Sequence, residues 1–168
     1  MNPALTLPPL IGPEQAALIA RRVSIIVGSR DADNRPHVMR AVGCRLAADL
    51  RRITVFLSAS TSAQVLADLR SNALIAVVFS EPSTHRTVQF KGSDALVAPI
   101  EPGDEAVVDR YLRSFIQEIS LIGFPENVAH SILGHSGDLV AVHFTPLTGF
   151  EQTPGPTAGQ ALPHHADR

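Results

Sequence analysis

Three strand-like segments follow one another early in the chain: VSIIVGSR at residues 23–30, HVMRAVGCRL at residues 37–46 and ITVFLS at residues 53–58. Each is short and contains β-branched residues, and the turn cluster DADNRP at residues 31–36 separates the first two. No helical pattern lies between them, which excludes an alternating βαβ sheet. Turn signals at intervals of about eight to twelve residues favour antiparallel pairing.

The rest of the chain adds three strand candidates and several helices. Strands are predicted at residues 73–80, 86–97 and 139–144, and helices at residues 13–22, 61–72, 104–122 and 125–133. Residues 152–168 are rich in Pro, Gly and polar residues, and we expect an extended or flexible C-terminal tail there. We therefore predict one domain over residues 1–151, a mostly β protein of the α+β class. Its six antiparallel strands would form a small closed or half-open barrel with peripheral helices.

Composition excludes several classes of protein. Hydrophobic residues make up 45% of the 168 and charged residues 18%, as in a folded domain. The net charge of −2 argues against a nucleic-acid or anionic-membrane partner, and the longest apolar run, near residues 73–79, is too short for a membrane helix. The single cysteine, Cys44, excludes an intrachain disulfide and a CxxC zinc site, and no metal site is predicted. Because the N-terminus does not read as a signal peptide, we expect a cytoplasmic protein.

Two arginines lie on the second strand candidate. Arg40 and Arg45 are five residues apart, so a regular strand would direct them to opposite faces. Gly43 between them is a candidate bulge that could re-aim one side chain. The alternative is a pair of ordinary surface arginines on a half-exposed strand.

A run of hydroxyl residues joins the third strand to the following helix. Ser58, Ser60, Thr61 and Ser62 lie where the helix would begin, and helix N-termini expose free N–H groups and a partial positive charge. Four hydroxyls in five residues exceed what one N-cap needs, so the run is a candidate phosphate cradle. Simple N-capping remains the alternative.

The strand candidate at residues 86–92 alternates between two kinds of side chain. Arg86, Val88 and Phe90 share one face, and Thr87, Gln89 and Lys91 share the other. The amide and hydroxyl groups of the second face could hydrogen-bond a planar heterocycle. The alternative is an ordinary row of solvent-facing residues.

Together these segments resemble the pyridoxamine 5′-phosphate oxidase-like family of FMN-binding split barrels. RAVGCR at residues 40–45 resembles the family's R-x-V-L-L-K strand, and residues 56–58 with the helix that follows resemble its F-Y-T segment. RTVQ at residues 86–89, followed by Gly92, resembles its R-Q-V-x-x-x-G strand. The resemblance covers about residues 20–100 and implies a six-stranded antiparallel split barrel.

The resemblance also implies roles for individual residues. Arg40 and Arg45 would serve the phosphate end of FMN, with Ala41 beside them in the same motif, and the backbone amide of Val42 would lie along the ring. Leu57 and Ser58 would touch the ribityl-phosphate, and Gln64 replaces a phosphate-binding Lys. Thr87 replaces a Gln that reaches across to the flavin. The cofactor-binding residues predicted from these motifs are Arg40, Ala41, Val42, Arg45, Leu57, Ser58, Ser60, Ser62, Gln64, Thr87 and Gln89.

Two departures from the family pattern bear on function. Ala63 replaces the Arg that usually precedes the phosphate-binding Lys, so two positive charges are missing where the helix begins. The family's C-terminal W…R segment, which serves pyridoxal chemistry, has no match in residues 149–168, which argues against a true pyridoxamine phosphate oxidase.

The hypothesis that follows is an FMN-dependent oxidoreductase, a homodimer with flavin at the subunit interface and an unknown small-molecule substrate or electron donor. Because a flavin would carry the redox chemistry, no acid–base pair or nucleophile need stand out, and no catalytic residue is assigned. One alternative is a non-catalytic flavin-binding or sensing module. Another is a split barrel that binds haem or F420 instead of FMN.

Overall fold

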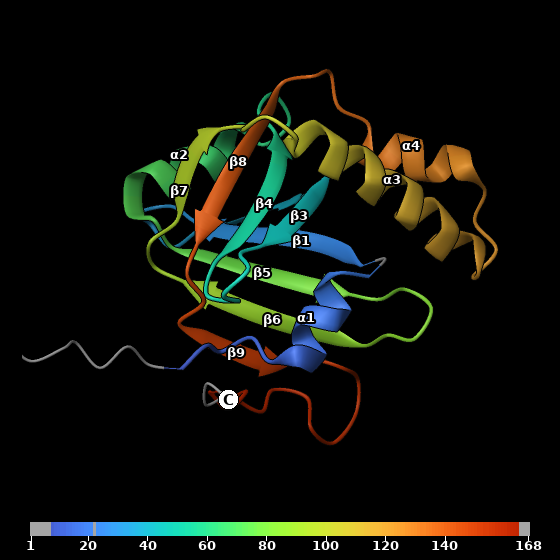
Figure 1. Cartoon of the computed structure of the whole chain (residues 1–168). Helices are drawn as coiled ribbons and strands as arrows, with labels where there is room; N and C mark the ends of the chain where they lie inside the picture. Colours follow the sequence, from blue (N-terminus) through green and yellow to red (C-terminus); the bar gives the residue numbers. More distant parts are fainter. Residues whose placement is uncertain (1–7, 22, 165–168) are drawn as a thin grey trace, which may run out of the picture.

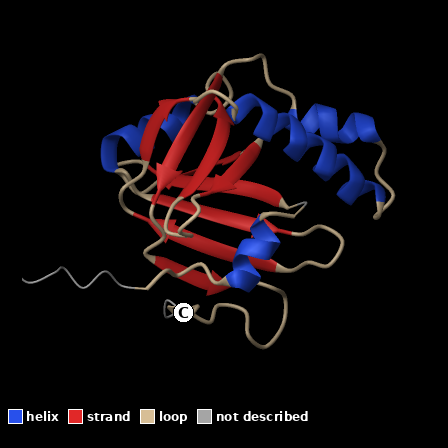
Figure 2. Ribbon diagram, in the orientation of Figure 1, coloured by secondary structure: helices blue, strands red, loops and turns tan. Residues whose placement is uncertain are grey.

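A computed structural model describes residues 8–21 and 23–164, and in it the strands form two antiparallel sheets (Figures 1 and 2). The five-stranded sheet has the order β2 (Pro36–Arg40), β1 (Ser24–Arg30), β5 (Ile75–Ser80), β6 (Thr87–Gly92) and β9 (Thr148–Glu151). The four-stranded sheet has the order β3 (Gly43–Leu46), β4 (Ile53–Ser58), β8 (Leu139–Phe144) and β7 (Leu96–Pro99). The α+β class and the antiparallel pairing predicted from sequence are confirmed.

Four helices lie around the sheets: α1 (Pro13–Ile19), α2 (Ala63–Asn72), α3 (Asp104–Ser120) and α4 (Glu126–Leu133). In Figure 1 the α3–α4 pair extends to one side of the four-stranded sheet, and α2 lies at the opposite side. Helix α1 ends at Ile19, short of the predicted residue 22, because a tighter turn follows, in which the Arg21 amide donates to the Leu18 carbonyl. Residue 22 itself lies outside the described residues. No helix among the described residues is long and apolar enough to span a lipid bilayer.

The described residues contain nine strands rather than the predicted six, because two predicted strands each divide between the sheets. The segment 37–46 divides at Ala41 and Val42: the Ala41 amide donates to Ile25 of β1 at 3.0 Å, and the Val42 amide donates to Phe56 of β4 at 2.9 Å. The segment 86–97 likewise divides into β6 and β7, and β9 is a short strand that the sequence did not reveal. The predicted bulge at Gly43 is therefore wrong, since Gly43 begins β3 on the second sheet.

Strand β4 is the most deeply enclosed element, with all six of its residues buried. Phe56 packs in a cluster with Val42 and with Val108 of α3. At Gly43 an added Cβ would lie 3.4 Å from both the Cα of Val108 and the Phe56 ring, so α3 packs close to β3. Helix α3 is thereby held against the segment that contains the predicted arginines.

The segment after β9 folds back onto the barrel as far as the structure describes it. The Glu151 amide donates to Gln160, the Leu162 amide donates to Gly149, and Ala161 pairs with Phe150. Leu162 packs against the main hydrophobic core. Residues 152–162 therefore cover the free edge of β9 rather than extending away from it.

Gly92 lies close against Phe144 and Thr145, and this close packing generates a stability prediction. A Cβ there would lie 2.8 Å from the Phe144 ring and 2.9 Å from the Thr145 carbonyl oxygen. We expect Gly92→Ala to lower the free energy of unfolding by about 1–3 kcal/mol, because the backbone must shift to accommodate the methyl group. Gly28→Ala is the matched control, since its nearest neighbour is 3.6 Å away and its effect should be under about 1 kcal/mol. Urea unfolding of the two variants measures the difference, and equal losses would contradict this account of Gly92.

Candidate functional site

The end of β4 forms a cradle of donors that holds a carboxylate of the chain itself. The Ser58 hydroxyl donates to Asp138 Oδ1 at 2.8 Å, and the Ser60 amide donates to Asp138 Oδ2 at 2.6 Å. The Ala59 amide also donates to the Asp138 carbonyl at 2.9 Å. The Ser60 hydroxyl and amide and the Ser58 hydroxyl lower the pKa of Asp138 far below its ordinary value. The predicted hydroxyl cradle thus binds an anion, and that anion is Asp138, which sequence reasoning missed.

Ser62 occupies the N-cap position of α2, next to this cradle. Its side chain makes no capping hydrogen bond, and its Oγ is buried without a partner among the described residues. A buried hydroxyl without a partner is costly, because it has lost hydrogen bonds to water. The first turn of α2 also leaves backbone N–H groups available. A hydrogen-bonding ligand at this point would satisfy groups that the folded chain leaves unpaired.

Gln64, two residues after Ser62, belongs to a different cluster. It donates to Asp68 at 3.0 Å, and Asp68 also accepts from Ser29 at 2.7 Å and bonds His37 Nδ1 at 2.8 Å. Asp68 is 3% exposed. Burial alone would raise the pKa of Asp68, but the hydrogen bonds from Ser29, His37 and Gln64 together hold it below the ordinary value. The sequence indicates this cluster only by placing Asp68 on the apolar side of the predicted helix. It does not indicate that Ser29, His37 and Gln64 are the partners of Asp68.

The two predicted arginines lie apart and are already engaged. The Arg45 guanidinium pairs with Asp104 and Glu101, each at 2.9 Å. Arg40 donates to the Ser24 hydroxyl. Arg45 therefore neutralises carboxylates at the start of α3, and Arg40 lies on the other sheet.

Arg40 shares one face of the five-stranded sheet with Thr87 and Gln89. Strand register places Arg40, Ile26, Val78, Gln89 and Phe150 in one row across the sheet, and these side chains point away from the core.

Thr87 lies on the same outward face of that sheet. It is in register with Ser80, and their hydroxyls are 2.8 Å apart. The expectation that Thr87, Gln89 and Lys91 share a face is confirmed, because this face alternates with the buried residues Val88 and Phe90.

Three predicted site residues have side chains that are too buried to contact a ligand. The side chains of Ala41 and Leu57 are fully buried in the core, and Val42 is 5% exposed. The Val42 amide, which was expected to face the flavin ring, donates to Phe56 instead.

Six of the eleven predicted site residues fall into two groups. Ser58, Ser60 and Ser62 gather where β4 meets α2, whereas Arg40, Thr87 and Gln89 lie on the outward face of the other sheet. None of the hydrogen bonds described for the second group reaches the first. Each group by itself is half of the predicted flavin site.

No protein-family model matches this chain, and no curated protein is significantly similar to it in sequence. Solved structures nevertheless share its fold. HupZ of Group A Streptococcus superposes with a TM-score of 0.54 and 17% identity, covering 89% of this chain and 99% of that one. An F420 reductase gives 0.51 and 14%, covering 83% and 98%.

A pyridoxamine 5′-phosphate oxidase-related, FMN-binding protein from Nostoc punctiforme gives a TM-score of 0.50 and 10% identity, covering 88% of this chain and 87% of that one. At these identities the similarity establishes the fold. The split barrel inferred from the sequence motifs is confirmed.

The Asp68 cluster generates a prediction about stability and acid. Asp68→Ala leaves the buried Ser29 hydroxyl and the half-buried His37 ring without their shared partner, and we expect a loss of about 1–3 kcal/mol in the free energy of unfolding at pH 7. Asp33→Ala, which removes only an exposed pair with Arg35, should cost well under 1 kcal/mol. Urea unfolding followed by circular dichroism measures both.

The dependence on pH follows from the sign of the shift. The pKa of Asp68 is lower in the folded protein than the ordinary 3.8, so its carboxylate stabilises the fold above that pH. This contribution is lost as the pH falls through the folded-state pKa. The difference between the wild type and Asp68→Asn should therefore shrink below pH 4, and a difference that grows there would contradict the shift.

Proposed function

We propose that this chain binds FMN and serves as a flavin-dependent oxidoreductase, with the flavin held between two copies of the chain. The observation that carries the proposal is the buried Ser62 hydroxyl without a partner, at the start of a helix and beside two further serines. It supports the proposal because a phosphate is an acceptor with several oxygens, and a helix N-terminus favours negative charge. The split-barrel fold, shared with an FMN-binding protein and an F420 reductase, supports it further.

The residues at the start of α2 fit a phosphate on one condition. Ser58, Ser60 and Ser62 supply hydroxyl and amide donors, but the Asp138 carboxylate already takes those of Ser58 and Ser60. Ala63 and Gln64 add no positive charge to the first turn of the helix. A phosphate would therefore bind here only as the Asp138 side chain moves aside, and the two anions would compete for the same donors.

The outward face of the five-stranded sheet would supply the other half of the site. It carries Arg40, Thr87 and Gln89 beside the apolar side chains of Ile26 and Val78. In a twofold dimer each contact between the two copies occurs twice. The start of α2 in one copy would then face the five-stranded sheet of the other copy, and the reverse. A flavin ring offers acceptor and donor edges to amide and hydroxyl groups and flat faces to apolar side chains.

When bound, FMN would supply hydride and electron transfer. The residues of this chain would bind and orient it: serines at the phosphate end, and Thr87 and Gln89 as hydrogen-bonding groups toward the ring. The enclosed sheet face would exclude water from the ring. No residue of the chain is required to form a covalent bond.

F420 is a second candidate, and the Asp138 carboxylate is the observation that favours it. A terminal phosphate monoester carries up to two negative charges, whereas a phosphodiester, as in F420, carries one. The first turn of α2 contains no cation, and the Asp138 carboxylate already binds the serine donors. This site therefore favours the phosphate group with the lower negative charge, which is the phosphodiester. The absorbance spectrum of the freshly purified protein separates the two, because it shows which cofactor the protein carries.

Titration with FMN and riboflavin tests the phosphate cradle. We expect Asp138→Asn to bind FMN about tenfold more tightly than the wild type, because the competing charge is gone. The Asn amide oxygen can still accept from the Ser60 amide, and its NH2 group can donate to the Ser58 hydroxyl, so the loop should keep its fold. Riboflavin, which lacks the phosphate, should bind both proteins alike. Fluorescence quenching of the flavin measures the four affinities.

Ser62→Ala is the complementary variant. It should weaken FMN by roughly threefold to tenfold, as expected for one hydrogen bond, and leave the apo protein as stable or more so. The stability of the apo protein is the control, because the substitution removes an unpaired hydroxyl. Equal affinity of wild type and both variants for FMN would overturn the cradle.

Light scattering tests whether the protein is a dimer. We expect a mass of about twice 17.9 kDa for the wild type. Val78→Lys, in the middle of the outward sheet face, should yield monomers and weaken flavin binding, whereas Leu121→Lys, exposed on the turn after α3, should remain dimeric. A monomeric wild type that still binds FMN tightly would contradict a site shared between copies.

A further inference from the structure

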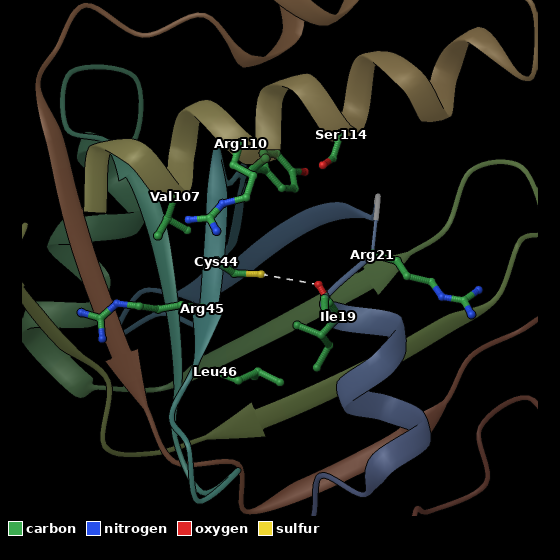
Figure 3. A pocket seen from close by; sticks show the side chains of 10 residues that line it. Ile19, Arg21, Cys44, Arg45, Leu46, Val107, Arg110 and Ser114 are labelled. Carbon is green, nitrogen blue, oxygen red and sulfur yellow. Dashed lines mark hydrogen bonds between the residues drawn. The ribbon is translucent and has the colours of Figure 1, made fainter. Parts of the chain in front are cut away.

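A cavity of about 320 Å³ lies between the end of α1, strand β3 and helix α3 (Figure 3). Its volume is at the lower end of the range for small-molecule sites. Its apolar walls include Ile19, Leu46 and Val107, and the side chain of Cys44 lies on the β3 side. None of the predicted cofactor-binding residues except Arg45 lines it.

The charged residues that line this cavity are all basic. Three arginines, Arg21, Arg45 and Arg110, line it, and no acidic residue does. Figure 3 shows the guanidinium groups of Arg21 and Arg45 directed to opposite sides, away from the cavity. Arg45 is held there by Glu101 and Asp104, and Arg21 lies 3.7 Å from Glu81.

Arg110 differs from the other two arginines. Its guanidinium reaches from α3 over Cys44 in Figure 3, and it makes no hydrogen bond or ion pair with any residue in the described ranges. Ser114 lies one helical turn further along, and its hydroxyl likewise has no described partner. Residues four apart share a helix face, so both sets of unused donors point to the same side of α3.

The other polar groups at the cavity carry no charge. Burial raises the pKa of the Cys44 thiol to about 12, and burial likewise raises the pKa of Tyr111. The Tyr111 hydroxyl is occupied, since it donates to the Val23 carbonyl at 2.6 Å. At neutral pH the cavity therefore presents an apolar interior with one unpaired guanidinium and one free hydroxyl.

We propose that this cavity binds a small organic carboxylate with an apolar body. A guanidinium binds a carboxylate through two parallel hydrogen bonds, and the Ser114 hydroxyl can donate a third. The apolar walls suit a single ring or a short alkyl chain. The binding of the carboxylate does not depend on the proposed flavin function.

The chain carries its own probe for this test. Tyr111 is the only tyrosine, there is no tryptophan, and Tyr111 lines the cavity. Phenylacetate, benzoate and hexanoate are titrated into the full-length protein without flavin, with tyrosine emission and calorimetry as readouts. We expect saturable binding of at least one of them, with the corresponding neutral amide at least about tenfold weaker.

Arg110→Gln should weaken the carboxylate about tenfold or more. Arg113→Gln is the matched control, because Arg113 is exposed on the same helix and does not line the cavity, and it should change the affinity less than about twofold. Unchanged thermal unfolding of both variants confirms that they fold. Absence of binding for all three carboxylates, equal binding of acid and amide, or equal loss in both variants would overturn the proposal.

The same proteins separate this proposal from the proposed function. If the carboxylates bind as expected but neither FMN nor F420 does, the flavin function fails and the carboxylate site stands as a binding site alone. If flavin binds and no carboxylate does, the flavin function stands and the carboxylate site is wrong. If both bind, the carboxylate should perturb the flavin absorbance in the wild type and not in Arg110→Gln.

Discussion

Two consecutive backbone amides hold the architecture together: Ala41 donates to β1 and Val42 donates to β4. Neighbouring residues of one strand would normally bond within one sheet, so this pair marks the point where the chain passes from one sheet to the other. This change of sheet determines where the next strands and their side chains lie. Strand β3 becomes the edge of the second sheet, Arg45 is separated from Arg40, and β4 becomes the buried strand that leads to the serine cradle.

Several charged side chains of this protein form ion pairs or hydrogen bonds with other residues of the same chain. Arg45 is neutralised by Glu101 and Asp104, and the buried Asp68 is satisfied by three donors. Asp138 occupies the place where a ligand phosphate is proposed. Because buried or clustered charges are costly unless paired, the groups left unpaired are the informative ones. Among the described residues, Ser62 at the start of α2 has a buried hydroxyl without a partner, and the exposed guanidinium of Arg110 at the cavity has no described partner.

Those two groups lie on either side of the β3–β4 pair. Ser62 follows the end of β4, and Arg110 lies on the helix that packs against β3, where Gly43 permits close contact. The proposed phosphate end and the proposed carboxylate cavity are thus positioned by the same two strands. A rigid, buried β4 between them is a suitable support, since sites on strands and helices are held more firmly than sites on loops.

The sequence by itself determined the element types and the pairing sense, because β-branched runs, turn clusters and helical spacing are local properties of the chain. It also located the hydroxyl cradle and the Thr87–Gln89 face, since alternation within a strand is local too. Only the tertiary structure decided what each group touches. Arg45 and Asp104 are 59 residues apart, Ser58 and Asp138 are 80 apart, and nothing near either residue in the sequence indicates its partner. The same limit applies to β3, β7 and β9, because four-residue strands are defined by their neighbours across the sheet and not by their own pattern.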